Sequence, residues 1–182
     1  MTTALILVDI QNDYFPGGAN ELATPEISGE RAAKALALFR RKALPVFHVR
    51  HISLQPGATF FLPDTPGSEI HERVRPAEGE PVVIKHAPDS FYKTPLLEML
   101  RARNVTRLVI CGMMSHMCVD TTVRAAKSLG FDLIVVHDAC TTMNLTWKGE
   151  AIPARKVHDT FMAAMNHTFA RMVKVDELEN AL

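Results

Sequence analysis

Three residues have side chains that could act together as an acid, a cation and a nucleophile. Asp9 lies in the apolar stretch LILVDI, Lys85 ends the apolar stretch VVIK, and Cys118 follows CGMMSHM. Burying a carboxylate is costly unless it is paired, so Asp9 could bind Mg²⁺, take phosphate or hydrogen-bond a neighbouring loop. A cysteine that begins a helix can be held as a thiolate by the helix amides and dipole, which would favour nucleophilic chemistry.

Each of these residues also has a structural explanation. Lys85 could extend its ammonium to solvent where its strand leaves the sheet. Cys118 could be a small buried hydrophobe, although this description fits Cys111 better, because Cys111 lies inside an apolar strand. Cys140 is taken as structural. The residues taken singly leave both explanations open.

The elements that must position these side chains alternate between strand and helix. This alternation predicts a three-layer α/β/α fold, with a parallel sheet, helices on both faces and right-handed crossovers. The strands are expected at 4–10, 45–51, 81–86, 107–112, 132–139 and 171–177, and the helices at 28–42, 94–103, 118–129 and 154–166.

The carboxyl ends of the strands are where an open parallel sheet binds ligands. Asp9, His51 and Lys85 lie at three of these ends, and the segment that leads to Cys118 follows a fourth. The connection 52–80 is too long for a simple crossover, with one helical turn expected near 68–74. Long loops in compact domains are usually functional or disordered, and Phe60 and Phe61 argue for a lid or pocket wall.

The composition favours an ordinary globular enzyme or binding protein. The 182 residues suit one domain spanning 1–182, and 20 basic residues balance 20 acidic ones. A net charge of zero gives no support to a nucleic-acid or membrane partner. Three cysteines in no framework spacing favour a reducing compartment, and the first residues lack the basic region of a signal peptide. We therefore expect a cytoplasmic protein.

Cofactor and metal motifs are absent from the sequence. There is no G-x-G-x-x-G, no P-loop, no C-x-x-C and no G-x-S-x-G elbow. Zinc held by Cys111, Cys118, Cys140 and His116 would need irregular spacings. His48 and His51 point to opposite faces of a regular strand and cannot share an ion there. We expect neither a metal nor a cofactor.

Four segments in order resemble the isochorismatase-like cysteine hydrolases, a superfamily that includes nicotinamidases, N-carbamoylsarcosine amidases and isochorismatases. They are ALILVDIQNDY, VVIKHAPDSFYKTPL, LVICGMMSHMCVDTTVRAA and VVHDACTT. The resemblance implies a Rossmann-like six-stranded sheet of order 3-2-1-4-5-6. It also implies a catalytic triad of Asp9, Lys85 and Cys118, with a non-proline cis peptide before Met114.

The implied mechanism is acyl transfer through sulfur. Asp9 takes the proton of Cys118, and Lys85 and the helix N-terminus stabilise the thiolate, which attacks an amide-type carbonyl. The backbone N–H groups of Met114 and Cys118 receive the developing oxyanion. Asp9 then protonates the leaving amine and activates water. In this strand order Lys85 lies two strands from Asp9, so its side chain must lean inward.

The sequence also departs from parts of the family. Metal-dependent nicotinamidases carry an Asp and two or more His after the second strand, whereas this chain has HVRHISLQPGATFF. The leading hypothesis is therefore a metal-independent hydrolase of a small amide, carbamoyl or ureido compound. An isochorismatase-type vinyl ether hydrolase with Asp9 as general acid, and a non-catalytic ligand-binding relative, are the alternatives. The family resemblance also implies a homo-oligomer, either a dimer or a larger assembly. The expected substrate contacts are Gln11, Phe15, His51, Phe60, Phe61, Phe91, Tyr92 and His116.

Overall fold

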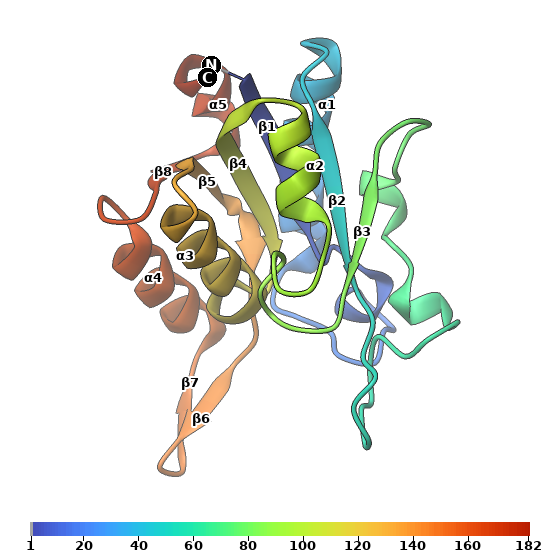
Figure 1. Cartoon of the computed structure of the whole chain (residues 1–182). Coiled ribbons are helices and arrows are strands. Elements are labelled where there is room, and N and C mark those ends of the chain that lie inside the picture. The colour runs from blue at the N-terminus through green and yellow to red at the C-terminus, as the bar shows by residue number, and fades with distance from the viewer. Residues whose placement is uncertain (1) are drawn as a thin grey trace.

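The computed structural model describes residues 2–182 and has a sheet of six parallel strands at its centre (Figure 1). The strand order β3-β2-β1-β4-β5-β8 confirms the expected order, with β8 as the sixth strand. The neighbouring strands are paired in parallel throughout this sheet. The strands are β1 (Thr2–Val8), β2 (Val46–His51), β3 (Val82–Lys85), β4 (Val105–Met113), β5 (Asp132–Thr141) and β8 (Arg171–Val173).

Helices cover both faces of the sheet and confirm the three-layer α/β/α architecture. Figure 1 shows α2 and α3 on the near face, beside α4, with α1 behind the sheet. The short C-terminal α5 lies with α1, because Glu179 pairs with Arg41 and Lys42. The helices are α1 (Pro25–Arg41), α2 (Leu96–Ala102), α3 (Asp120–Ser128), α4 (Ala154–Met165) and α5 (Leu178–Ala181). No helix within residues 2–182 is long and apolar enough to cross a membrane.

The central strands are apolar along their whole length because both of their faces are covered. Leu5, Ile6 and Val8 of β1 are fully buried, as are Val109 and Ile110 of β4. A strand that is buried on both faces needs a continuous apolar run rather than an alternating pattern. This requirement explains why the sequence predicted these strands well.

The ends of several elements differ from the prediction. Helix α1 begins at Pro25, after Thr24, rather than at Ser28, because proline fits the first helical position. Helix α2 begins at Leu96, with Pro95 as its cap, whereas Thr94 was expected as the cap and Pro95 as the first helical residue. The sixth strand ends at Val173 rather than Glu177, because Asp138 Oδ1 accepts a hydrogen bond from Val175 N and a 3₁₀ turn follows.

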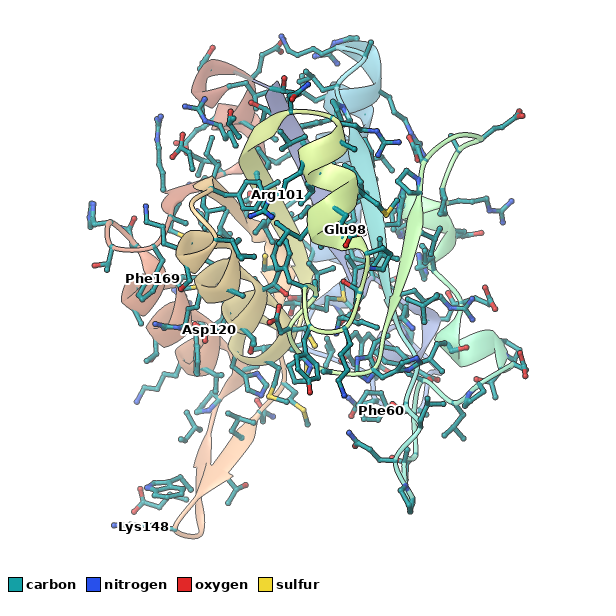
Figure 2. The ribbon with its side chains drawn as sticks, viewed as in Figure 1. Phe60, Glu98, Arg101, Asp120, Lys148 and Phe169 are labelled. Carbon is teal, nitrogen blue, oxygen red and sulfur yellow. The ribbon has the colours of Figure 1, made fainter. Side chains whose placement is uncertain are left out.

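A short antiparallel hairpin, β6 (Leu145–Trp147) and β7 (Glu150–Ile152), was not predicted. Its strands have three residues each and its side chains are mostly exposed, so no alternating pattern marks it. Figure 2 shows Lys148 at the tip of this hairpin. The hairpin projects from the same end of the sheet as the loop that carries Phe60.

The sheet register brings the candidate catalytic residues to this end. Val8 pairs with Val49 on one side and with Gly112 on the other, and His51 pairs with Lys85. Asp9 and the loop after β4 therefore emerge next to each other. The connection 52–80 crosses the same end and contains two 3₁₀ turns, Pro66–Ser68 and Glu72–Val74, the second within the predicted helical turn.

Gly112 is required where β4 passes β1. Its φ is +137°, and a Cβ there would lie 2.0 Å from Val8 O. We expect Gly112→Ala to lower the free energy of unfolding by about 2–4 kcal/mol, because backbone strain and a backbone clash add together. Urea unfolding monitored by circular dichroism measures this change.

Gly149→Ala is the matched control. Gly149 also has a positive φ, but an added Cβ would meet no atom within 4 Å. This substitution should lower the free energy of unfolding by about 1 kcal/mol or less. Equal losses in the two variants would contradict the assigned contact between Gly112 and Val8.

Candidate active site

Asp9 is a buried carboxylate at the end of β1. Its backbone lies in the left-handed region, with φ +50°, a conformation that costs free energy and must be held by its surroundings. Its Oδ2 lies 2.8 Å from Lys85 Nζ, and both side chains are fully buried. The carboxylate also faces the thiol of Cys118. The charge of Asp9 is thus balanced by Lys85, and Cys118 is close enough to give Asp9 a proton.

Lys85 reaches Asp9 from the edge strand β3, leaning inward across β2 as the strand order requires. Its Nζ donates to Ala87 O at 2.9 Å, His51 Nδ1 at 3.0 Å and Cys118 Sγ at 3.2 Å. Burial lowers the pKa of Lys85, but the neighbouring Asp9 and Cys118 raise it more, so its pKa lies above its ordinary value. Lys85 is therefore an ammonium ion that contacts both other members of the implied triad.

The loop after β4 carries Cys118 to the same place. The Met113–Met114 peptide bond is cis, at the position where the family resemblance implies one. A π-helical turn, η4 (Ser115–Val119), then precedes α3. Cys118 lies in this turn, whereas the sequence predicted it as the first residue of the helix. Single π-helical turns of this kind are frequent at functional sites.

The surroundings of Cys118 favour its protonated thiol over the thiolate. Burial raises its pKa and the Asp9 carboxylate raises it further, against the opposing effect of Lys85. Loss of the proton to solvent would leave two anions beside one cation. Transfer of the same proton to Asp9 replaces the Asp9–Lys85 ion pair with a Cys118–Lys85 ion pair and leaves the net charge unchanged. The geometry therefore favours an internal proton transfer over ionisation to solvent.

His51 is a neutral member of the same cluster. An ammonium group can only donate, so His51 Nδ1 must accept from Lys85 and the ring proton must lie on Nε2. Burial and the charge of Lys85 lower the pKa of His51 to about 4. The imidazole is consequently uncharged at neutral pH.

Asp9, His51 and Cys118 also offer ligand atoms within 4.8 Å of one another, the one such group of three found in residues 2–182. The ammonium of Lys85 contacts a ligand atom from each, at 2.8, 3.0 and 3.2 Å. The carboxylate, imidazole and thiol that could bind a metal ion therefore already surround a cation of the protein, the ammonium of Lys85.

A pocket of about 300 Å³ is lined in part by Cys118. It confirms that the 52–80 connection forms a pocket wall, since residues of that segment line one side. Five of the residues named from the sequence line the pocket: His51, Phe60, Phe61, Met114 and Cys118.

The other five expected substrate contacts lie outside the pocket lining. Gln11 is fully buried, and its amide bonds His51 N, His51 O and Ser68 O, so it holds the end of β2 in place. Phe15 stacks on His71, and Phe91 stacks near Phe131. Tyr92 is exposed under Lys93, and His116 bonds Thr142 Oγ1.

Tyr14 lines the pocket and was missed by the sequence analysis. Its ring is buried against Phe60 and Phe61, and burial together with Cys118 raises the pKa of its hydroxyl. Tyr14 ends the QNDY segment that follows Asp9, and this position was the signal available in the sequence.

Asp13 fixes the pocket wall. Its carboxylate accepts a hydrogen bond from Phe61 N at 2.6 Å and another from Ala19 N at 3.2 Å. The backbone of the wall passes so close that a Cβ on Gly67 would lie 2.0 Å from Asp13 Oδ1. Phe61 itself has a positive φ of 56° and is fully buried, so the wall depends on this anchor.

Comparisons with known proteins agree with this geometry. A family model described as the isochorismatase domain matches residues 3–177. The chain belongs to the isochorismatase family. A Bacillus subtilis member of the family, YddQ, is 52% identical over 170 residues, covering 93% of this chain and 94% of that one.

Two further relatives within the same family have named activities. A streptothricin hydrolase of Streptomyces noursei is 36% identical and covers 97% of this chain, which spans 60% of that protein. The crystal structure of an N-carbamoylsarcosine amidase from Thermoplasma acidophilum has a TM-score of 0.81 and 29% identity, covering 98% of this chain and 99% of that one. Family members are hydrolases and amidases, and this chain is a hydrolase of that family.

Replacing Asp13 with asparagine should loosen the pocket wall. A hydrogen bond to a charged acceptor contributes about 1.5–3 kcal/mol, so amide exchange at Phe61 should become roughly 10- to 100-fold faster. Hydrogen–deuterium exchange of peptides from the 52–67 segment measures this effect.

Asp64→Asn is the control, because Asp64 is an exposed acid of the same segment. Its exchange should match that of the wild-type protein. Unchanged exchange in Asp13→Asn would show that the carboxylate does not hold the wall.

Proposed function

We propose that this protein hydrolyses the C–N bond of a small, uncharged amide, carbamoyl or ureido compound through a thioester on Cys118. The observation that carries the proposal is the position of its sulfur. Cys118 lines the pocket, and its Sγ lies 3.2 Å from the ammonium of Lys85 and next to the carboxylate of Asp9. A thiol, a proton acceptor and a cation at one pocket are the parts that nucleophilic acyl transfer requires.

The proposed reaction has two halves. In the first, Asp9 takes the thiol proton, the sulfur attacks the carbonyl carbon, and Asp9 returns the proton to the leaving amine as the C–N bond breaks. In the second, Asp9 takes a proton from water, the hydroxide attacks the thioester, and the proton returns to the sulfur of Cys118. Lys85 stays charged throughout and stabilises whichever group is the anion.

The oxyanion is expected to bind at the turn before α3. Met114 follows the cis peptide, and Met114 and Cys118 both line the pocket. Their backbone N–H groups are the proposed donors, and each such donor contributes about 3–4 kcal/mol in other acyl-transfer enzymes. Because the backbone would do this work, the side chain of Met114 could vary.

The pocket lining indicates an uncharged substrate. His51 is neutral, and the lining contributed by residues 2–182 contains no Asp, Glu, Arg or Lys. Besides the residues named from the sequence, the larger lining side chains are Tyr14, Ser53, Gln55, Thr59, Pro88 and Met117. Aromatic walls with a few hydroxyl and amide groups suit a small, partly flat molecule. The amidase among the structural relatives supports a C–N bond as the target.

This lining also separates the proposal from the ether-hydrolase alternative. Isochorismate carries two carboxylates, and an enzyme that binds it needs cations in its pocket, because buried charges require partners. The pocket offers none, so ether hydrolysis with Asp9 as general acid has no support from its residues. From the sequence and the family resemblance, we also propose a cytoplasmic homo-oligomer without a metal or other cofactor.

A panel of small amides, carbamoyl compounds and ureido compounds tests the proposal. We expect hydrolysis of at least one, and we expect Cys118→Ala to lower kcat by at least roughly a thousandfold, because it removes the attacking atom. Ammonia or amine release measures turnover, and acid quenching followed by mass spectrometry detects the acyl group on the protein.

Cys111→Ala is the control, since it removes a buried thiol of β4 that lies outside the pocket. It should retain activity. Full turnover by Cys118→Ala would refute the nucleophile. Hydrolysis of isochorismate, with no amide accepted, would favour the ether hydrolase instead.

A further inference from the structure

Tyr14 is held at the pocket by its ring and its backbone. Its side chain is 2% exposed, and its ring centroid lies 4.6 Å from that of Phe61, which it meets edge-on, and 5.9 Å from that of Phe60. Its backbone N–H donates to Gln11 O, and its carbonyl accepts from Leu22 N, both at 3.1 Å. These contacts fix the direction of the ring and leave its hydroxyl group uncommitted.

The hydroxyl group of Tyr14 is available to a molecule in the pocket. A buried tyrosine usually has a hydrogen-bond partner for its hydroxyl. Within residues 2–182 the influences on the pKa of this hydroxyl are burial and three neighbouring charges, with no hydrogen bond among them. Its oxygen is also not one of the fully enclosed polar atoms that lack a partner in that range. Because Tyr14 lines the pocket, its partner must come from the contents of the pocket.

The same hydroxyl lies close to the reacting groups. Burial raises its pKa, and the charges of Cys118 and Asp9 raise it further, so the group stays an uncharged phenol during turnover. A phenol can accept a hydrogen bond through its oxygen and donate one through its hydrogen. Tyr14 is therefore suited to holding a polar molecule beside Cys118 rather than to taking a proton from it.

The second half of the proposed reaction needs a group of this kind. The water that attacks the thioester must give one hydrogen to Asp9 and keep its oxygen directed at the acyl carbon. Asp9 is fully buried and lies outside the pocket lining, so this water must lie between Asp9 and the lining at Cys118. An acceptor for the other hydrogen would hold the water in the productive orientation.

Tyr14 fits this position better than the other polar side chains of the lining. Gln55 and Thr59 come from the wall formed by the 52–80 connection, and both are exposed. Tyr14 is buried, as Cys118 is, and follows Asp9 closely in the chain.

We propose that the hydroxyl of Tyr14 binds the water that hydrolyses the thioester on Cys118, accepting one of its hydrogens while Asp9 takes the other. The water oxygen bonds to the acyl carbon, the C–S bond breaks, and the proton held by Asp9 passes to the sulfur of Cys118. Tyr14 keeps its own proton, and the hydrogen that it held leaves with the product acid. The inference rests on the proposed function, which supplies the thioester.

The ester p-nitrophenyl acetate separates the two halves of the reaction, in wild-type protein and in Tyr14→Phe. Its good leaving group makes acylation fast, so a burst of p-nitrophenolate is followed by steady turnover at the rate of thioester hydrolysis. In Tyr14→Phe, we expect the rate of the burst to be unchanged. The steady rate should fall roughly ten- to a hundredfold, because the attacking water loses its orientation. Acid quenching and mass spectrometry should find more of the protein acetylated on Cys118 than in the wild type.

Tyr92→Phe is the matched control. Tyr92 is the other tyrosine of the chain, is exposed and lies outside the pocket lining. Its burst and its steady rate should match those of the wild-type protein.

Three results would overturn the inference. In Tyr14→Phe, the steady rate could be unchanged, or the burst could slow as much as the steady rate, which would assign the hydroxyl to acylation or substrate binding. Failure of Tyr14→Phe to fold would also overturn it, because the hydroxyl would then have a partner in the protein. Absence of an acetyl group from Cys118 in the wild-type protein and in both variants would instead refute the proposed function.

Methanol gives a second readout that a purely structural role of Tyr14 would not change. Methanol has one O–H hydrogen, which it can give to Asp9, and none to give to Tyr14. The hydroxyl should therefore favour water over methanol as the attacking molecule. In Tyr14→Phe, the ratio of methyl acetate to acetate should rise roughly two- to tenfold, the effect of one net hydrogen bond. An unchanged ratio would contradict a contact between Tyr14 and the attacking water.

Discussion

The ion pair between Asp9 and Lys85 is the interaction on which the rest of the site depends. It joins β1 to the edge strand β3 across β2, with both side chains fully buried. Removing one partner of such a pair leaves an uncompensated buried charge, which is strongly destabilising. In the proposed reaction, this pair would let a third group, Cys118, exchange a proton with Asp9 without changing the net charge.

Several local backbone conformations that cost free energy position the residues around this ion pair. Asp9 takes a left-handed backbone, Gly112 lets β4 pass close to β1, and a π-helical turn presents Cys118. Phe61, also left-handed, donates its N–H to the buried carboxylate of Asp13, which holds the pocket wall that Phe61 and Cys118 share. Strained positions gather where function requires them and are held by the packed sheet around them.

The sequence predicted the fold, and the meeting of Asp9, Lys85 and Cys118 at one edge of the sheet, better than it predicted the lining of the pocket. Buried parallel strands are continuous apolar runs, and their polar ends had to meet at one edge, so Asp9 and Lys85 could be placed from their context. The cis peptide was implied only by the family resemblance. The pocket lining depends on how a 29-residue connection folds over the site, from Ile52 to Glu80, and local patterns do not specify this. Gln11 and Phe15 were expected to contact the substrate but lie outside the pocket lining. Gln11 hydrogen-bonds the backbone of His51, and Phe15 packs on His71, although both follow Asp9 closely in the sequence.

The central claim is that the proton of Cys118 moves to Asp9 rather than to solvent, and the pH dependence of Cys118 alkylation in Asp9→Asn tests it most directly. In the wild-type protein the transfer is internal, so the rate should be nearly constant across neutral pH. In Asp9→Asn the thiol loses the anion that raises its pKa and stays beside Lys85, so the proton leaves for solvent, and the rate should fall about tenfold per pH unit below the new thiol pKa. The same pH dependence in both proteins would contradict the account.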